Sequence, residues 1–141
     1  MPAEPIQVNE PRKPRVLIAD DASGMRTYLR TILVAAGLEC VEARDGGEAF
    51  DAILKSSFDL LITDLDMPGM DGFQLISAVS LLPVSRGRPP IIVCSALLDE
   101  TLALRRPELR AASALLAKPV QPDDLLNTVT LVKSGDEIAK A

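Results

Sequence analysis

The amino-acid sequence predicts an α/β fold: a doubly wound parallel sheet of five strands, covered by helices on both faces. Five short apolar runs recur along the chain, and segments with helical spacing separate them. The runs are apolar at consecutive positions, which is typical of strands that a parallel sheet buries on both faces. Right-handed crossovers then place helices on either side of the sheet. The predicted strands are 16–19, 40–41, 60–63, 91–94 and 115–117.

Apolar residues three or four positions apart, the spacing of one helix face, predict the helices. Four helices are predicted in this way, and the apolar residues that mark each of them in turn are Met25, Leu29, Ile32, Leu33 and Ala36; Ala49, Phe50, Ile53 and Leu54; Phe73, Ile76 and Val79; and Leu125, Leu126, Val129 and Val132. Gly37 predicts the end of the first helix, and Pro122 the first turn of the last. Asp71-Gly72 opens the third. The fourth helix is the least regular, because Pro107 should break or kink a helix over 99–106.

The composition predicts one domain with an aliphatic core. The 141 residues fit a single domain, and 48% of them are apolar, enough for a sizeable core. Only 3% are aromatic. Residues 1–14 hold four of the eleven prolines and show no periodicity, which indicates a disordered arm. We therefore expect an N-terminal arm over 1–14, one domain over 15–133 and a C-terminal tail over 134–141.

Charge, hydropathy and residue usage exclude several classes of protein. The net charge of −5 argues against a general nucleic-acid binder, which usually carries a basic patch. The longest apolar run, 91–98, is too short to cross a bilayer, and the N-terminus lacks the apolar core of a signal peptide. We therefore expect a cytoplasmic protein, in which Cys40 and Cys94 are reduced core residues. The absence of histidine excludes His-ligated zinc, Ser–His hydrolysis and phosphohistidine chemistry on this chain.

Polar residues with chemical potential fall where the predicted strands end. Asp20-Asp21 follow the first strand and Asp64 the third. Ser95 follows the fourth strand, and Lys118-Pro119 follow the fifth. In doubly wound sheets, ligands bind beyond the carboxyl ends of the strands, where the strand order reverses. The sequence therefore predicts a site at this edge of the sheet.

This set of residues suits phosphoryl transfer. Three carboxylates that lie together repel one another, and a hard divalent cation relieves the repulsion. Mg²⁺ prefers oxygen ligands in near-octahedral geometry and retains several waters. An aspartate beside the metal can attack phosphorus as a nucleophile, and a nearby ammonium and hydroxyl can bind the oxygens of the transferred group.

The motifs IADD, TDLDMPGMDG, VCSA and AKP, in this order and spacing, resemble those of receiver domains in two-component response regulators, the CheY-like proteins. The resemblance covers residues 14–133. It implies a flavodoxin-like α/β sandwich with the strand order 2-1-3-4-5. It also implies that the chain takes a phosphoryl group from a phosphohistidine donor, with Mg²⁺ bound, and changes conformation to signal to a partner.

The resemblance also implies roles for individual acidic residues. Asp64 corresponds to the phosphoacceptor, and Asp21 to a direct ligand of Mg²⁺, for which Mn²⁺ can substitute. The metal is also bound by Asp64 itself and by the backbone carbonyl of Asp66. Asp20 corresponds to the acidic neighbour that acts on the metal mainly through water.

Three further residues and the partners follow from the same resemblance. Ser95 corresponds to the hydroxyl that moves toward the phosphoryl group, and Lys118 to the cation that pairs with it. Pro119 corresponds to a residue that follows the lysine in a cis peptide. The implied partner is a sensor histidine kinase or a histidine phosphotransfer protein, with no direct contact to nucleic acid or membrane. The implied activity is that of a signalling phosphoacceptor that catalyses its own phosphotransfer; the output is not identified.

Two departures from the family concern the conformational switch. Leu115 stands where the family usually has Tyr or Phe, three residues before the lysine. Pro107 falls inside the usual fourth helix. Burying a leucine on activation gains little that folding has not already gained. We therefore expect the signal to pass mainly through Ser95, the loop near 96–99 and the segment around Pro107.

Each residue also has a purely structural interpretation. Asp21 and Ser23 are acceptable helix caps, and Asp64 precedes an obvious turn. Ser95 and Lys118 alone would usually be a core hydroxyl and a solvated charge. The functional interpretation is favoured because all the strand-end positions coincide.

Two other functions remain as alternatives. Asp64-Leu65-Asp66 resembles the DxD motif of haloacid-dehalogenase-type phosphatases, which also form aspartyl phosphates. Those enzymes carry the motif on their first strand, follow it with Thr or Val, and need a cap domain. Here the motif follows the third predicted strand and Met67 comes next. A receiver-like domain used only for interaction is the other alternative, and the complete acidic set argues against it.

Overall fold

The computed structural model describes residues 12–133. Within them, five strands form one sheet in the order β2-β1-β3-β4-β5, and every neighbouring pair is parallel. This confirms the predicted doubly wound α/β fold and its strand order. The predicted tail over 134–141 and most of the predicted arm over 1–14 lie outside the described residues. The elements are β1 (Arg15–Ala19), α1 (Ser23–Ala35), β2 (Glu39–Ala43), α2 (Gly46–Lys55), β3 (Leu60–Thr63), α3 (Gly72–Ser80), η1 (Val84–Arg86), β4 (Ile91–Ser95), α4 (Leu102–Arg105), η2 (Pro107–Ala111), β5 (Ala114–Ala117) and α5 (Pro122–Lys133).

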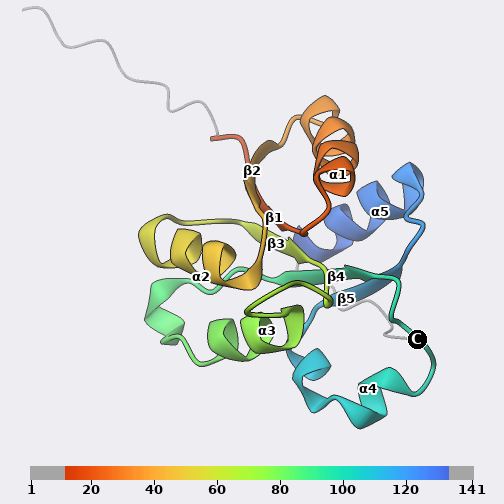
Figure 1. The fold of residues 1–141 in the computed structure, drawn as a ribbon. Coiled ribbons are helices and arrows are strands. Elements are labelled where there is room, and N and C mark those ends of the chain that lie inside the picture. Colours follow the sequence, from red (N-terminus) through yellow and green to blue (C-terminus); the bar gives the residue numbers. More distant parts are fainter. Residues whose placement is uncertain (1–11, 134–141) are drawn as a thin grey trace, which may run out of the picture.

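Helices cover both faces of the sheet, and each face has its own hydrophobic core (Figure 1). Val16 and Ile18 of β1 pack with buried residues of α1 and α5. Leu17 and Ala19, which alternate with them, pack with buried residues of α2 and α3. Because successive strand residues face opposite sides, a strand between two helix layers must be apolar at every position. This is why the strands appear in the sequence as continuous apolar runs.

The segment between β4 and β5 differs from the helix expected over 99–106. Helix α4 has only four residues, and Arg106 leaves the helical region with φ −127° and ψ 87°. Helical backbone is disfavoured before a proline, so Pro107 begins the 3-10 helix η2 instead. Leu109 of η2 is buried, and the Arg106 guanidinium lies 3.4 Å from the centre of the Phe73 ring. The predicted helix was therefore too long, because this segment turns to pack against α3.

The two cysteines are buried free thiols, as the sequence predicts. Burial raises the pKa of Cys94 to about 12 and that of Cys40 to about 11. Both thiols therefore stay protonated near neutral pH. As for membrane insertion, no helix in residues 12–133 is both long and apolar enough to cross a bilayer.

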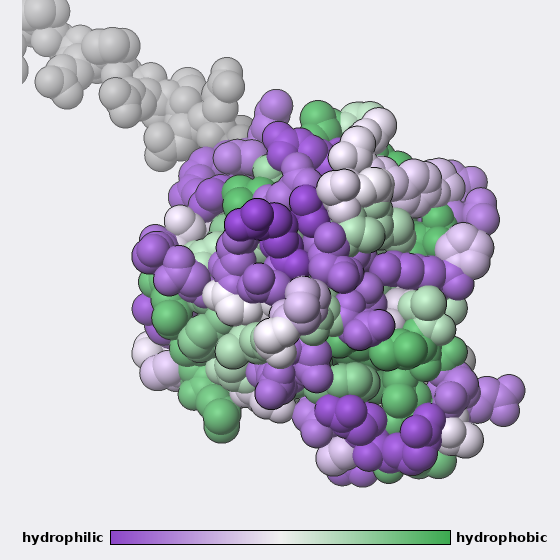
Figure 2. All heavy atoms as spheres, in the orientation of Figure 1, coloured by the Kyte–Doolittle hydropathy of each residue, from purple (hydrophilic) through white to green (hydrophobic). Residues whose placement is uncertain are grey.

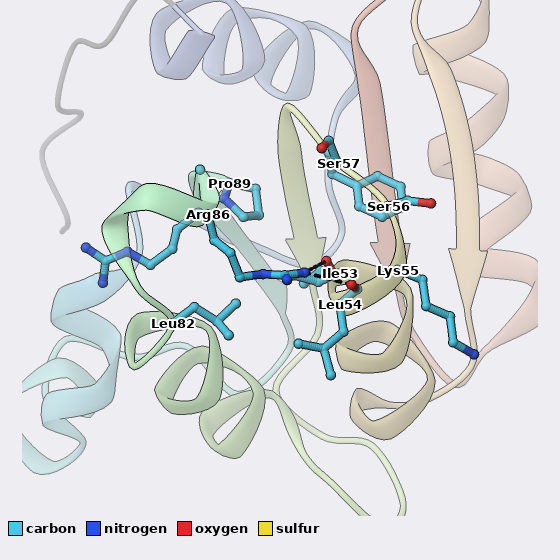
Figure 3. Close-up of a pocket in the computed structure, with 11 residues that line it drawn as sticks. Ile53, Leu54, Lys55, Ser56, Ser57, Leu82, Arg86 and Pro89 are labelled. Carbon is cyan, nitrogen blue, oxygen red and sulfur yellow. Dashed lines mark hydrogen bonds between the residues drawn. The ribbon is translucent and has the colours of Figure 1, made fainter.

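A polar pocket of about 310 Å³ lies where β3 and β4 begin, at the opposite end of the sheet from the strand-end aspartates (Figure 3). Arg86 of η1 crosses this pocket. Its Nη2 donates hydrogen bonds to the backbone oxygens of Ile53 (3.0 Å) and Leu54 (2.7 Å) in the last turn of α2. The last carbonyls of a helix have no partner within the helix and carry partial negative charge. Arg86 therefore caps α2 from a distance and joins it to the segment before β4.

Replacing Arg86 by methionine should lower the free energy of unfolding by about 1 kcal/mol, because two carbonyls lose a charged donor. Urea unfolding followed by circular dichroism measures this. Arg105→Met is the matched control, since Arg105 forms only an exposed pair with Asp99 in addition to a bond to Thr101. We expect the control substitution to lower the free energy of unfolding by less than about 0.5 kcal/mol. Equal destabilisation by the two substitutions would contradict the capping role.

Candidate functional site

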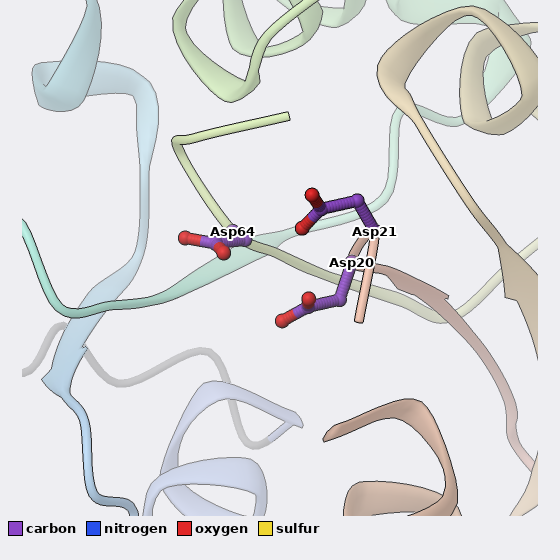
Figure 4. Close-up of side chains that lie close together, drawn as sticks. All are labelled: Asp20, Asp21 and Asp64. Atoms are coloured by element: carbon purple, nitrogen blue, oxygen red, sulfur yellow. The ribbon is translucent and has the colours of Figure 1, made fainter. Parts of the chain in front are cut away.

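Three aspartates meet at the carboxyl edge of the sheet, with their side chains directed toward a common region (Figure 4). Asp20 and Asp21 follow β1, and Asp64 follows β3. One carboxylate oxygen from each lies within 4.8 Å of the others. The position of Asp64 follows from the sheet itself, because its backbone N–H continues the β1–β3 pairing by donating to Ala19 O at 2.9 Å. The structure thus brings together the carboxylates that the sequence placed at separate strand ends.

Two of the three carboxylates are buried, and their oxygens have partners. Asp20 is 2% exposed and Asp64 is 7% exposed. Asp20 Oδ1 accepts from the Ala22 N–H at 2.9 Å, and Asp64 Oδ1 accepts from the Leu65 N–H at 2.7 Å. Buried charges are costly unless they are paired and hydrogen-bonded. The remaining oxygens of Asp20 and Asp64 therefore require a cation.

Lys118 supplies that cation from the end of β5. Its Nζ donates to Asp20 Oδ2 at 2.8 Å and to Asp64 Oδ2 at 2.9 Å. Burial lowers the pKa of Lys118, but the hydrogen bonds and negative charges of the two aspartates outweigh burial and raise it overall. The ammonium is therefore fully charged near neutral pH. The peptide between Lys118 and Pro119 is cis, as the family resemblance implied.

Asp21 differs from its two neighbours. It is exposed, and within residues 12–133 its carboxylate has no hydrogen-bond or ion-pair partner. The N-cap of α1 is Ala22, and neither Asp21 nor Ser23 makes a side-chain capping hydrogen bond, so the interpretation of these two residues as helix caps is wrong. Asp21 is thus an acidic side chain at the mouth of the cluster that nothing in the described chain neutralises.

The remaining predicted residues lie around this cluster. Ser95 is fully buried at the end of β4, and its Oγ accepts from the Leu97 N–H at 3.1 Å. Its backbone oxygen accepts from the Lys118 N–H at 3.0 Å, which places the two residues side by side. Asp66 is exposed in the loop after β3, and its N–H lies 3.4 Å from Asp64 Oδ1.

Two glycines that the strand-end pattern did not select also shape the site. A Cβ on Gly72 would lie 2.0 Å from the backbone oxygen of Asp64, and a Cβ on Gly46 would lie 2.4 Å from that of Met70. Only glycine permits such close backbone approach. The signal was present in the sequence, since Gly72 ends the TDLDMPGMDG motif. These contacts keep the loop from Asp64 to Gly72 pressed against the sheet edge and α2.

The donor set of the cluster consists of oxygen atoms alone. Carboxylate and carbonyl oxygens suit a hard cation such as Mg²⁺ and do not favour softer metals. The unpartnered Asp21 gives such an ion an accessible ligand, while the buried aspartates lie behind it. The chemistry of the site therefore fits a magnesium ion beside a potential carboxylate nucleophile and a lysine.

Comparison with known proteins agrees with this geometry. A sequence model of the response regulator receiver domain family matches residues 16–130. The chain is 34% identical over 116 residues to the chemotaxis protein CheY of Bacillus subtilis, a match covering 82% of this chain and 93% of that protein. It is 36% identical over 120 residues to the sensory/regulatory protein RpfC of Xanthomonas campestris pv. campestris. That match covers 84% of this chain but only 16% of the much longer relative.

Solved structures show the same relationship. The fold matches that of chemotaxis protein CheY4 of Vibrio cholerae with a TM-score of 0.76 and 32% identity, covering 86% of this chain and 99% of that one. A CheY-like receiver domain protein of Methanospirillum hungatei matches with a TM-score of 0.77 and 28% identity, covering 88% and 96% of the two chains. The sheet order, the strand-end residues and the match over most of the sequence agree: the chain belongs to the response regulator receiver domain family.

Proposed function

We propose that this chain is a phosphoacceptor in a two-component phosphorelay. It takes a phosphoryl group from a phosphohistidine donor, on a sensor histidine kinase or a histidine phosphotransfer protein, onto Asp64. The observation that carries the proposal is the buried Asp64 carboxylate, which lies 2.9 Å from the Lys118 ammonium and within 4.8 Å of two more carboxylates. The names of several relatives, among them RpfC and the sensor protein GacS of Pseudomonas syringae, support a sensor-type partner.

In this reaction a carboxylate oxygen of Asp64 forms a bond to phosphorus, and the bond from phosphorus to the donor's imidazole nitrogen breaks. The domain itself supplies the groups that assist the transfer. Lys118 is already charged and already in contact with Asp64, so its ammonium can pair with the oxygens of the incoming group. The chain thus acts as a cytoplasmic signalling phosphoacceptor that catalyses its own modification.

For the metal we propose Mg²⁺, replaceable by Mn²⁺, with Asp21, Asp64 and the backbone carbonyl of Asp66 as ligands. Bound there, the ion would neutralise the negative charge that gathers during phosphoryl transfer. The exposed, unpartnered carboxylate of Asp21 supports direct binding. Both oxygens of Asp20 already accept hydrogen bonds, from Ala22 and Lys118, which supports its action through water.

The hydrolase alternative finds little support. Its DxD motif belongs on the first strand, whereas Asp64 follows β3, the third strand in chain order. The cap domain it requires is not present among residues 12–133, which form a single sheet with its helices. A domain used only for interaction would not need a charged lysine between two buried aspartates. The receiver function therefore accounts for the most observations.

Incubation with acetyl phosphate and Mg²⁺ should add one phosphoryl group to the wild-type chain, visible by intact-protein mass spectrometry. Asp64→Asn should not label, because an amide is a poor nucleophile. Asp66→Asn is the control: it removes one nearby negative charge, but the side chain is exposed and its backbone carbonyl remains. Normal labelling of Asp64→Asn would remove Asp64 from the acceptor role.

Asp21→Asn should weaken Mg²⁺ binding by roughly tenfold or more, since even the outer partners of metal ligands cost about that much when mutated. Isothermal titration calorimetry measures the affinity. Thermal unfolding in EDTA should be unchanged or improved, because the substitution relieves repulsion among three carboxylates. Asp66→Asn again serves as the charge-matched control. If both variants bind Mg²⁺ equally well, Asp21 is not a specific ligand.

We further propose that the domain reads its phosphorylation through the β4–β5 side of the sheet. Leu115 is half-buried and already packs against the core shared with α2 and α3. Among the described residues, the Ser95 hydroxyl is bonded only within its own loop, where it accepts from the Leu97 N–H. Leu97 and Leu104 are exposed apolar residues of this region. Figure 2 shows hydrophobic surface (green) just above the lower edge of the view, and that edge, where Figure 1 places α4, is mainly hydrophilic (purple).

Amide chemical shifts with and without beryllofluoride, a phosphoryl mimic, test this route. We expect large changes at Ser95 and across 96–110, because the hydroxyl that now accepts from the Leu97 N–H must move to donate to the new acceptor. Changes at Leu115 should be small, since this leucine already packs against the core and its further burial gains little. A large response at Leu115, with 96–110 unaffected, is the outcome that contradicts this proposal.

A further inference from the structure

Arg26, in the first turn of α1, is a charged residue buried beside the acidic cluster. Its side chain is only 12% exposed. Nη1 donates a hydrogen bond to the backbone oxygen of Asp20 at 2.7 Å, and Nε donates to Glu42 Oε1 at 3.1 Å. A guanidinium in so little contact with water requires strong partners. One of these partners is the peptide group that connects Asp20 to Asp21.

The hydrogen bond from Arg26 to this peptide links Arg26 to the direction of the Asp21 side chain. The side chain of Asp20 is bonded at both oxygens, and its N–H donates to Ala43 O at 3.1 Å. The carboxylate of Asp21 has no partner of its own within residues 12–133. Its direction therefore depends on the orientation of the Asp20–Asp21 peptide plane, and the Arg26 guanidinium is the donor that binds the oxygen of that plane.

Glu42 of β2 determines where the guanidinium points. Its two carboxylate oxygens bind two arginines of α1: Oε1 accepts from Arg26, and Oε2 accepts from Arg30 at 3.0 Å. Arg30 lies one helical turn further on, and its side chain is 49% exposed. Within residues 12–133 its hydrogen-bond and ion-pair partner is Glu42. The two arginines thus share one partner, but only Arg26 also reaches the site.

We propose that Arg26 is a positioning residue: through the Asp20 carbonyl it fixes the peptide before Asp21 and so directs the Asp21 carboxylate toward the metal. The inference rests on the proposed function, because it concerns the magnesium ion of that site. The direction in which Mg²⁺ affinity changes when Arg26 is replaced distinguishes positioning from a simple charge effect. A guanidinium repels a divalent cation, so removing the charge alone should tighten Mg²⁺ binding. Loss of positioning should weaken it.

The test compares Arg26→Met with Arg30→Met by isothermal titration with MgCl₂. Both variants remove one arginine from Glu42, and only the first removes the bond to Asp20. We expect Mg²⁺ affinity to fall roughly tenfold to a hundredfold in Arg26→Met, the range seen when the outer partners of metal ligands are lost. Arg30→Met should bind as tightly as wild type or more tightly. The rate of labelling by acetyl phosphate in Arg26→Met should return toward the wild-type value at saturating Mg²⁺.

Thermal unfolding in EDTA establishes that each variant is folded. If Arg26→Met does not fold, Arg26→Lys decides, because lysine keeps the charge but cannot reproduce the two directed bonds of the guanidinium. We expect its affinity to lie below that of wild type. Wild-type affinity in the folded variant, or an equal loss in Arg30→Met, overturns the proposal. Failure of the wild-type chain itself to bind Mg²⁺ and to label would instead overturn the proposed function.

Discussion

The ion pairs of Lys118 with Asp20 and Asp64 are the constraint on which the rest of the site depends. The parallel pairing of β1 and β3 brings two carboxylates to the same buried edge, where an unpaired charge is costly. Lys118 follows β5, the edge strand, which is separated from β3 by β4. Its ammonium therefore reaches Asp20 and Asp64 only when the strands are paired in register. Removing one member of such a group leaves an uncompensated buried charge. The chemistry of the domain is in this sense inseparable from its topology.

The sequence predicts this arrangement well where a single physical pattern dominates. Strand β3 appears as Leu60–Thr63, the range that its apolar run indicated, because both faces of a central strand are buried. The strand-end rule also selected Asp20, Asp64 and Lys118, since parallel strands end at one edge. The sequence could not predict the bonds from Lys118 to the two aspartates, because they join residues 98 and 54 positions apart.

Where several effects compete, the sequence is less informative. A helix was possible over 99–106, with a break or kink expected at Pro107, but the helix that forms has only four residues. The backbone is restricted before Pro107, and Arg106 stacks on Phe73. Arg26 shows a second limit: it is one of two arginines on the same helix, and nothing in the sequence distinguishes it from Arg30. Only the packing of α1 against β2 separates a buried donor from an exposed one.

The formal charge of the cluster has a consequence for how it binds ions. Three carboxylates and one ammonium leave a formal charge of −2, which one divalent cation balances. Lys118 neutralises one of the three negative charges, so the cluster without metal still attracts a cation. Under the proposed function, a phosphoryl group on Asp64 would add negative charge to this site. Lys118 would then exchange its bond to Asp20 for one to the new anion, and a change in charge at Asp64 would change which strand ends are connected.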